Sequence, residues 1–261
     1  MNRRRKPHAL TVAGSDSGGG AGIQADLKTF AALGVFGTSA VTAVTAQDSR
    51  GVVAVEPVSP RLVARQIAVV LADLGADAVK TGMLWSGEIV AAVAGALADA
   101  RVPNLVVDPV IASTAGTRLL DDSGVEALRG RLLPLARVVT PNLSEAARLA
   151  GMEVEGLEQA IEAGRRILEL GPRSVVVTGG HLTGEPVDLL IEGRKVRRFS
   201  GGRIAGGAHG TGCVFSAALT ARLALGASLS GAVAGAKRFV ESALRRRLSL
   251  GRGRPMLDPR C

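Results

Sequence analysis

Short runs of β-branched residues alternate with amphipathic helical patterns along nearly the whole chain. We expect strands at residues 9–14, 39–47, 52–58, 77–82, 105–110, 137–140, 174–179 and 187–201. The last run holds two strands joined around Gly193 and Arg194, a pattern typical of a hairpin. Helical spacing fills the segments between the runs, including 123–133, and several of these segments stop at glycine. This alternation predicts a mostly parallel central sheet with helices on both faces.

The composition favours a single domain of this class. The chain has 261 residues, of which 47% are hydrophobic and only 2% aromatic. A core of alanine, valine, leucine and isoleucine suits parallel strands that helices cover on both faces. We therefore expect one α/β domain at residues 7–247, with a basic N-terminal tail at 1–6 and a basic C-terminal tail at 248–261.

The net charge of +9 belongs to the two chain ends. Residues 1–6 carry four basic groups, and residues 245–261 carry six basic groups and one acid, whereas residues 7–244 carry 22 of each sign. A neutral body without aromatic stacking residues makes a nucleic-acid binder the least favoured reading. We interpret the ends as solvated tails, with an acidic partner as the alternative.

We expect a cytoplasmic protein with no membrane association. No stretch approaches the roughly 20 consecutive apolar residues that span a bilayer. The basic opening MNRRRK turns to glycine before an apolar segment of signal-peptide length is reached. The two cysteines, Cys213 and Cys261, lie in unrelated settings, so a disulfide framework is not expected.

Residues 206–219, GGAHGTGCVFSAAL, form a glycine-rich loop that leads into a helix. Ligands of open α/β sheets bind at the carboxyl ends of strands. Neither the dinucleotide glycine motif nor a P-loop is present in the sequence, so a nucleotide would have to bind in another way. Here Gly210, Thr211, Gly212 and Cys213 can present backbone N–H groups to an anion. The same helix N-terminus should lower the pKa of the Cys213 thiol, so that its sulfur can accept a proton from an alcohol attacking phosphorus. A small buried residue at a helix start is the alternative.

Carboxylates follow two of the predicted strands. Proline after Asp108 ends one strand and holds this carboxylate at its tip. Asn142 and Glu145 lie three residues apart on an opening helical turn, where they could hold magnesium through water. Ordinary helix capping explains this pair equally well.

Other strand-end residues could contact a small ligand. Asp16 and Asp26 lie in and after the loop GSDSGGGAG, where they are either ligand contacts or ordinary loop and cap residues. The amide of Gln47 can both donate to and accept from the edge of a heterocycle. Met83 either lines an apolar slot or fills the core.

Seven of these segments occur together in one order between about residues 9 and 240: AGSDSGGGAGIQADLKTF, TAVTAQDSRGV, KTGML, VVDPV, TPNLSEA, GGHL and HGTGC. In order and spacing they resemble the hydroxymethylpyrimidine/phosphomethylpyrimidine kinases of thiamin biosynthesis, a branch of the ribokinase-like superfamily. The resemblance implies a single-domain ribokinase-like sandwich that uses ATP and Mg²⁺. Its substrate would be 4-amino-5-hydroxymethyl-2-methylpyrimidine and then the monophosphate of this compound. It further implies a cytoplasmic homodimer.

The resemblance also implies residue roles. Cys213 would be the base within the anion hole formed by residues 210–213, and Gln47 would bind the aminopyrimidine edge. The remaining predicted site consists of Gly14, Ala21, Asp26, Met83 and Val110 for the substrate, Asn142, Thr178 and Lys237 for the nucleotide, and Asp108 and Glu145 for the metal.

Three positions depart from the family pattern. Thr178, Gly206–Ala208 and Thr114 stand where the family usually or often has a lysine or a lysine-containing run. Loss of cations near the ATP phosphates would weaken stabilisation of the transition state. Arg118, Arg203 or Lys237 would then have to compensate, or one of the two phosphorylation steps would be weak.

Two other functions remain open at this point. A pyridoxal or pyridoxine kinase shares the fold and a heterocyclic alcohol substrate, although Gln47 and the GGGAG loop favour the aminopyrimidine. A non-catalytic pyrimidine-binding regulator would explain the missing lysines and the basic ends. The intact HGTGC and NLSE segments argue against that regulator.

Overall fold

The computed structural model describes residues 6–113, 116–180 and 186–259. Nine strands in this part of the chain form one sheet with the order β3-β2-β1-β4-β5-β6-β7-β8-β9. The strands are β1 (His8–Asp16), β2 (Phe36–Gln47), β3 (Val52–Pro57), β4 (Ala78–Thr81), β5 (Leu105–Val107), β6 (Val138–Val139), β7 (Val175–Val177), β8 (Val187–Glu192) and β9 (Lys195–Ser200). The six strands from β2 to β7 in this order run parallel, and β3, β8 and β9 pair antiparallel.

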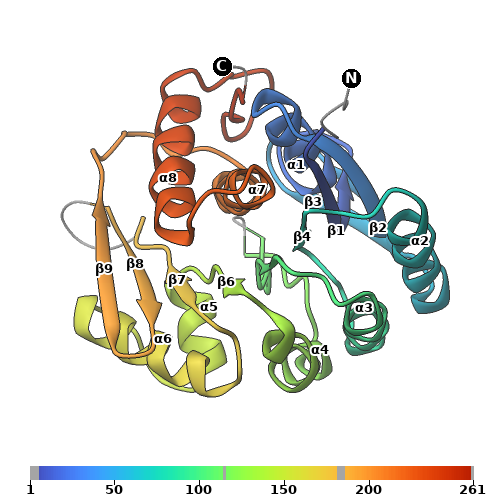
Figure 1. Ribbon diagram of the computed structural model, residues 1–261. Coiled ribbons are helices and arrows are strands. Elements are labelled where there is room, and N and C mark those ends of the chain that lie inside the picture. The colour runs from blue at the N-terminus through green and yellow to red at the C-terminus, as the bar shows by residue number, and fades with distance from the viewer. Residues whose placement is uncertain (1–5, 114–115, 181–185, 260–261) are drawn as a thin grey trace, which may run out of the picture.

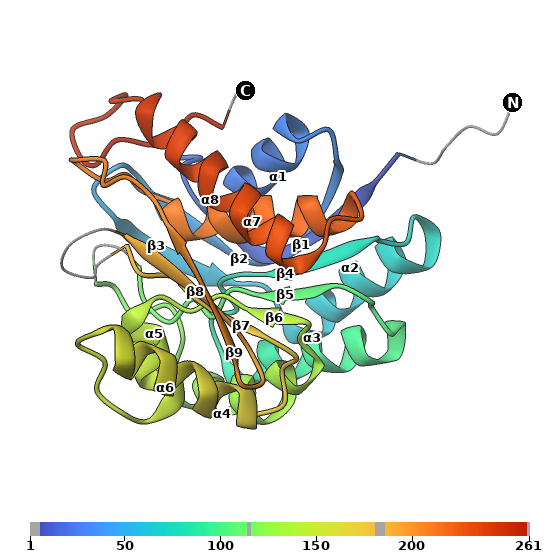
Figure 2. The same cartoon turned by 60° about the vertical axis from the view of Figure 1, so that its left-hand side comes forward.

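Helices cover both faces of the sheet (Figures 1 and 2). One face packs against α1 (Gly22–Ala32), α7 (Thr211–Ala224) and α8 (Leu229–Arg245). The other packs against α2 (Pro60–Asp73), α3 (Gly87–Ala100), α4 (Asp122–Ala127), α5 (Leu143–Ala150) and α6 (Leu157–Glu169). Successive strand residues point to opposite faces, so Val79 and Val107 join one core cluster while Ala78 and Val106 join the other.

The predicted α/β sandwich is confirmed, with a mostly parallel sheet and helices on both faces. The predicted hairpin is also present, since Glu192 pairs with Lys195 across its turn. The helix expected at 123–133 is broken into α4, a π-helical turn (Leu128–Leu132) and a 3-10 turn (Leu133–Leu135). Pro134 explains this end, because proline cannot donate the backbone hydrogen bond that continues a helix.

The chain after α8 differs from the expected solvated tail. Leu248 and Met256 exchange two backbone hydrogen bonds of 2.8 and 2.9 Å, and the Arg254 N–H donates to the Ser49 carbonyl at 2.9 Å. Leu257 is buried against the core cluster beneath α7 and α8. The arginines of this segment give it the composition of a solvated tail, so the burial of Leu257 is not evident from the sequence. Residues 248–258 therefore fold back over the loops that follow β1 and β2.

Some sequence predictions fall on residues outside the described ranges. These are the end residues 1–5, Thr114, the His-Leu part of the GGHL segment, and Cys261. In the described part of the chain, no helix is both long and apolar enough to cross a membrane.

Candidate active site

Four parallel strands end at one edge of the sheet, and the candidate active site lies at this edge. β1 ends at Asp16, β4 at Thr81, β5 at Val107 and β6 at Val139. The N-terminal half of α7 reaches the same edge, because Ser216 of α7 donates a hydrogen bond to Asp108 just after β5. The topology thus brings together loops that are far apart in the sequence.

A buried ion pair lies beneath these loops. Lys80 Nζ is 2.7 and 2.8 Å from the two carboxylate oxygens of Asp26, and neither side chain is exposed to solvent. The Thr11 hydroxyl donates to the same carboxylate at 2.6 Å. Burial alone would lower the pKa of Lys80, but attraction to Asp26, Cys213 and Asp108 raises this pKa above its usual range. Lys80 is therefore a permanent cation under the site.

Asp108 extends this network toward α7. Its Oδ2 lies 4.0 Å from Lys80 Nζ and accepts a 2.8 Å hydrogen bond from the Ser216 hydroxyl. Ser216 lies three residues after Cys213 on α7. The carboxylate predicted at the tip of β5 is thus held in place between a buried cation and the helix that carries the cysteine.

The loop before α7 requires glycine at one position. Gly210 is the N-cap residue and has a φ of 83°, in the left-handed region that favours glycine. A Cβ at this position would also overlap the Gly20 carbonyl oxygen of the first glycine-rich loop. The N–H groups of Thr211, Gly212 and Cys213 in the first turn of α7 lack partners inside the helix. The anion hole at these residues stays a prediction.

The predicted lowering of the Cys213 pKa is wrong. Burial raises the pKa of the Cys213 thiol to about 12, although Lys80 and the Gly22 N–H favour the thiolate. Asp108 and Asp26 add to the increase, because their negative charges disfavour a second anion. The helix N-terminus, which favours the thiolate, is outweighed by this burial and by the two carboxylates. At pH 7, Cys213 in this structure is a neutral thiol.

Asn142 and Glu145 form a complete capping box at the start of α5. The Glu145 N–H donates to the Asn142 side chain and the Asn142 N–H donates to Glu145 Oε2, both at 2.9 Å. Burial, and then repulsion from Asp108, raises the pKa of Glu145 to about 8. The capping interpretation is confirmed, and the carboxyl group is also close enough to Asp108 to feel its charge.

These two carboxyl groups fit a hard cation. Asp108 and Glu145 supply oxygen ligands, and the neighbouring Thr140 hydroxyl is buried without a hydrogen-bond partner among the described residues. Nowhere in residues 6–113, 116–180 and 186–259 do three or more acidic, histidine or cysteine side chains gather as a metal site. A magnesium ion here would take its other ligands from water and phosphate, as this ion commonly does.

Asp16 organises the first glycine-rich loop. Its carboxylate accepts hydrogen bonds of 2.8 to 3.0 Å from the N–H groups of Gly18, Gly20 and Ala21. His209 Nε2 lies 3.3 Å from the same carboxylate and 2.8 Å from the Gln47 side-chain amide. Burial opposes ionisation of Asp16, but the hydrogen bonds from His209, Ala21 and Gly18 lower its pKa below the usual range.

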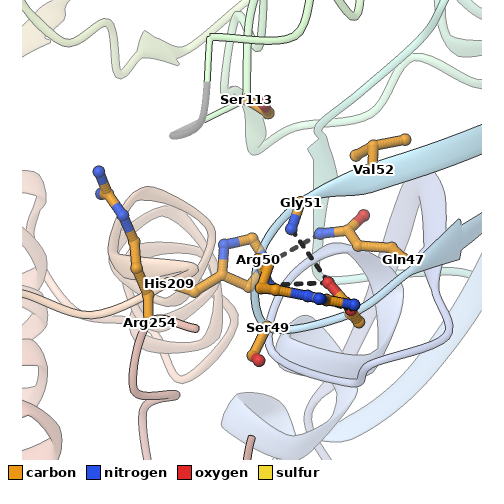
Figure 3. A pocket seen from close by; sticks show the side chains of 9 residues that line it. Gln47, Ser49, Arg50, Gly51, Val52, Ser113, His209 and Arg254 are labelled. Atoms are coloured by element: carbon orange, nitrogen blue, oxygen red, sulfur yellow. Dashed lines mark hydrogen bonds and ion pairs between the residues drawn. The ribbon is translucent and has the colours of Figure 1, made fainter. Parts of the chain in front are cut away.

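Gln47 stands at the mouth of the site (Figure 3). Its side chain and the His209 ring point toward each other, with the 48–51 loop and Arg254 beside them. A cavity of about 400 Å³ adjoins this mouth and is lined by Gly18, residues 47–50, residues 250–252 and Met256. The segment after α8 therefore forms part of the wall.

The predicted apolar residues lie close together. A Cβ at Gly14 would stand 3.1 Å from Met83 Sδ, and Met83 and Val110 pack in one cluster with Ala43 and Leu119. Asp26 does not join them, because Lys80 and Thr11 occupy its carboxylate in the interior. A direct contact between Asp26 and a substrate is therefore not a feature of this structure.

On the predicted nucleotide side, Thr178 lies next to Asn142, since the two form a parallel β-bridge. Lys237 is already occupied: its Nζ lies 2.9 Å from Asp188, whose other oxygen accepts the Gly179 N–H. Lys237 thus supports the turn after β7 instead of presenting a free charge. Arg118, another candidate to replace the missing lysines, forms a 2.9 Å ion pair with Asp122.

Sequence reasoning missed Lys80, Thr11, Ser216 and His209. One signal was available for Lys80, which interrupts the apolar run of β4, where a charge is costly unless it is paired. The partner, Asp26, lies 54 positions earlier in the chain. No local pattern identifies such a distant pair.

Comparison with known proteins agrees with this geometry. A family model described as phosphomethylpyrimidine kinase matches residues 16–258, which include most of the segment after α8. The hydroxymethylpyrimidine/phosphomethylpyrimidine kinase of Rhizobium meliloti is 49% identical over 251 residues, covering 94% of each protein. The thiamine biosynthesis bifunctional protein ThiED of Geobacter sulfurreducens is 49% identical over 258 residues. The match covers 97% of this chain but only 53% of that relative.

Solved structures show the same fold. An ADP complex of Bacillus subtilis pyridoxal kinase superimposes with a TM-score of 0.91 at 39% identity, covering 97% of both chains. A phosphomethylpyrimidine kinase from Clostridium difficile gives a TM-score of 0.83 at 41% identity, covering 92% of this chain and 100% of the other.

The buried ion pair predicts a large stability effect. Asp26→Asn leaves the Lys80 charge buried without its counter-ion, so the free energy of unfolding in urea should fall by about 3–5 kcal/mol. Adding Lys80→Met should recover much of this loss, because the unpaired charge is then removed. Asp48→Asn is the matched control at a surface pair with Arg50 and should change little. Equal small effects at both aspartates would contradict the role given to Lys80.

Proposed function

The chain belongs to the phosphomethylpyrimidine kinase family, and on this premise we propose how its strand-end residues divide the work. The protein is a kinase of thiamin biosynthesis that phosphorylates hydroxymethylpyrimidine and then the resulting monophosphate, with ATP as phosphate donor. One observation carries the assignment of roles. Cys213 lies in the first turn of α7, close enough to Lys80, Asp26 and Asp108 for their charges to shift the pKa of its thiol.

The first role belongs to the backbone of residues 210–213. The transferring phosphoryl group carries negative charge on its oxygens, and preorganised N–H donors at a helix N-terminus stabilise that charge. Lys80 does not touch the phosphate, because it is fully buried. It holds Asp26 and Asp108, and through Ser216 it fixes the helix that carries the donors.

The second role belongs to Cys213. As the hydroxymethyl oxygen forms its bond to the γ-phosphorus, its proton passes to Cys213 Sγ and ADP leaves. A thiol with a pKa of about 12 first has to release its own proton to water, so the thiolate is rare at neutral pH but strongly basic. The N–H groups of α7 and Lys80 are the groups that favour this thiolate.

The two phosphorylations differ in their need for a base. In the first step the acceptor is an alcohol, whose proton must be removed. In the second step the acceptor is a phosphate monoester, which has already lost most of its protons at pH 7 because its second pKa is about 6. Cys213 is therefore required as a base for the first step only.

The aminopyrimidine ring would occupy the apolar slot formed by Gly14, Met83 and Val110, with Ala21 beside it. Gln47 would pair with the edge that carries the amino group and a ring nitrogen. Met83 lies against Gly14 and packs in one apolar cluster with Val110, which supports an apolar contact surface for a flat ring. Asn142 and Thr178 would border the phosphates of ATP.

Mg²⁺ completes the proposal. Asp108 and Glu145 would hold the ion together with water and the ATP phosphates. When bound, the ion neutralises charge that develops on the phosphoryl oxygens. Repulsion between Asp108 and Glu145 supports this role, because a cation between these two carboxyl groups would relieve that repulsion.

A non-catalytic regulator is no longer favoured, because the relatives at 49% identity are named as kinases or as bifunctional biosynthetic proteins. Pyridoxal kinase activity remains the alternative within the fold, supported by the superposition on the Bacillus subtilis enzyme. The aminopyrimidine is the better supported substrate, because both the family match and the curated relatives carry its name.

We also propose a cytoplasmic homodimer. β2 and β3 extend the sheet at one edge, where Val44 and Val53 are 53% and 81% exposed. An apolar face of this kind is typical of a protein interface. Sedimentation should therefore give about twice the monomer mass of 26.6 kDa. A single 26.6 kDa species at micromolar concentration would contradict the dimer.

Separate assays of the two steps test Cys213. In Cys213→Ala, formation of the monophosphate should slow by about 10²- to 10⁴-fold, the usual contribution of a general base. Conversion of supplied monophosphate to diphosphate should change far less, because no alcohol proton is moved. Thermal unfolding of the variant controls for misfolding. Equal losses in both steps would show that Cys213 acts by positioning and not as a base.

The raised pKa of Glu145 predicts a pH effect on the metal-free protein. The native state holds this proton up to about pH 8, whereas the unfolded chain releases it near pH 4.5, so rising pH favours unfolding between these values. Glu145→Gln keeps the capping box and removes the titration. In EDTA, its stability relative to wild type should increase by up to about 1.4 kcal/mol per pH unit between pH 5 and 8.

Magnesium provides the second measurement on the same variant. Added Mg²⁺ should raise the melting temperature of the wild type at pH 8, because the ion binds the folded state. It should have a much smaller effect on Glu145→Gln. A pH-independent difference between the two proteins, or equal magnesium effects, would contradict the assignment of Glu145.

A further inference from the structure

The side-chain amide of Gln47 lies between His209 and Thr45. Either the oxygen or the NH₂ group of this amide can face His209. We propose that His209 is a positioning residue that carries its proton on Nε2 and thereby fixes the orientation of the Gln47 amide. The hydrogen-bonding pattern of the substrate edge that can pair with Gln47 then depends on His209. This inference rests on the proposed role of Gln47 in binding the aminopyrimidine.

His209 Nε2 has two polar neighbours that make opposite demands. The amide nitrogen position of Gln47 is 2.8 Å away and Asp16 Oδ2 is 3.3 Å away. An imidazole nitrogen either carries a proton and donates, or lacks one and accepts. It cannot accept from an amide NH₂ and donate to a carboxylate at the same time.

Asp16 decides between these alternatives. Its carboxylate already accepts three backbone hydrogen bonds from the glycine-rich loop, and such bonds stabilise the ionised form. An ionised carboxylate can only accept. The His209 nitrogen that faces Asp16 must therefore be the one that carries a proton.

With a proton on His209 Nε2, Gln47 must present its oxygen to that nitrogen. A half-turn of the amide about its terminal bond exchanges its two ends and brings the NH₂ group toward Thr45 Oγ1, which is 3.3 Å from the other amide position. Thr45 can accept there, because its single hydroxyl hydrogen is donated to the Ser15 carbonyl at 2.9 Å. Every member of the network is then satisfied.

This orientation leaves a defined pattern for the ligand. The Gln47 oxygen keeps one acceptor site on the His209 side, and the NH₂ group keeps one donor on the Thr45 side. An aminopyrimidine edge offers the complementary pair, an amino donor beside a ring-nitrogen acceptor. A 4-oxo analogue offers the reverse pair, a carbonyl acceptor beside a ring N–H. His209 therefore favours the amino form in one register.

The segment after α8 holds His209 in place. The His209 N–H donates to the Pro255 carbonyl at 2.8 Å, and the His209 ring and the Met256 side chain both lie against Gly20. A Cβ at Gly20 would stand 2.9 Å from the imidazole and 3.0 Å from Met256 Cγ. Backbone pairing and packing thus hold the His209 ring in place, and Figure 3 shows this ring pointing toward Gln47.

The test compares His209→Phe with His209→Gln in the full-length protein. Steady-state kcat and KM are measured for 4-amino-5-hydroxymethyl-2-methylpyrimidine and for its 4-oxo analogue. His209→Phe keeps a flat ring without a donor, so the preference for the amino substrate in kcat/KM should fall about tenfold, mainly through KM. His209→Gln restores an N–H donor and should recover most of the preference. Gln47→Ala is the control for the proposed role of Gln47.

The outcomes separate the two ideas. If Gln47→Ala abolishes the preference and His209→Phe leaves it unchanged, the inference about His209 is overturned while the role of Gln47 stands. If Gln47→Ala changes neither KM nor the preference, the proposed role of Gln47 is wrong. Failure of His209→Gln to exceed His209→Phe would also contradict a donor role. His209→Leu replaces the phenylalanine variant if that protein does not fold.

Discussion

The Lys80–Asp26 ion pair is the interaction on which the candidate active site depends. A lysine inside an apolar strand is tolerated only with a counter-ion in contact, and Asp26 supplies it from the first helix. Thr11 binds the same carboxylate, so one contact joins β1, β4 and α1. Asp108 and Ser216 carry the connection to β5 and α7. The buried charge of Lys80 therefore holds together the loops that meet at this edge of the sheet.

The charges around this pair support the proposal that magnesium and phosphate bind here together. Burial raises the pKa values of Glu145 and of the Cys213 thiol. The charge of Asp108 adds to both increases, and the charge of Asp26 adds to that of Cys213. A divalent cation would relieve the repulsion between Asp108 and Glu145. The N–H groups at the start of α7 would attract the negatively charged phosphate oxygens. The protein alone is thus electrostatically incomplete at the point where phosphoryl transfer is proposed.

Much of the fold could be predicted from the sequence, because hydrophobic periodicity is local and the strand–helix alternation has few topological solutions. The same holds for the capping box of Asn142 and Glu145 and for the cysteine at the loop-to-helix junction. Properties set by distant residues could not be predicted. The pKa of Cys213 depends on burial and on carboxylates from other strands, and the arginine-rich end of the chain hides Leu257, whose burial makes residues 248–258 part of the body. His209 acquires its partners only when loops 16–21 and 47–51 meet.

The most direct test of the central claim is a time course by mass spectrometry. Purified protein is incubated with Mg-ATP and hydroxymethylpyrimidine, with pyridoxine as a parallel substrate. The account predicts that the monophosphate appears first and the diphosphate follows at its expense, with pyridoxine phosphorylated more slowly. The absence of phosphoryl transfer to the pyrimidine, with the protein folded and both ligands bound, would contradict it.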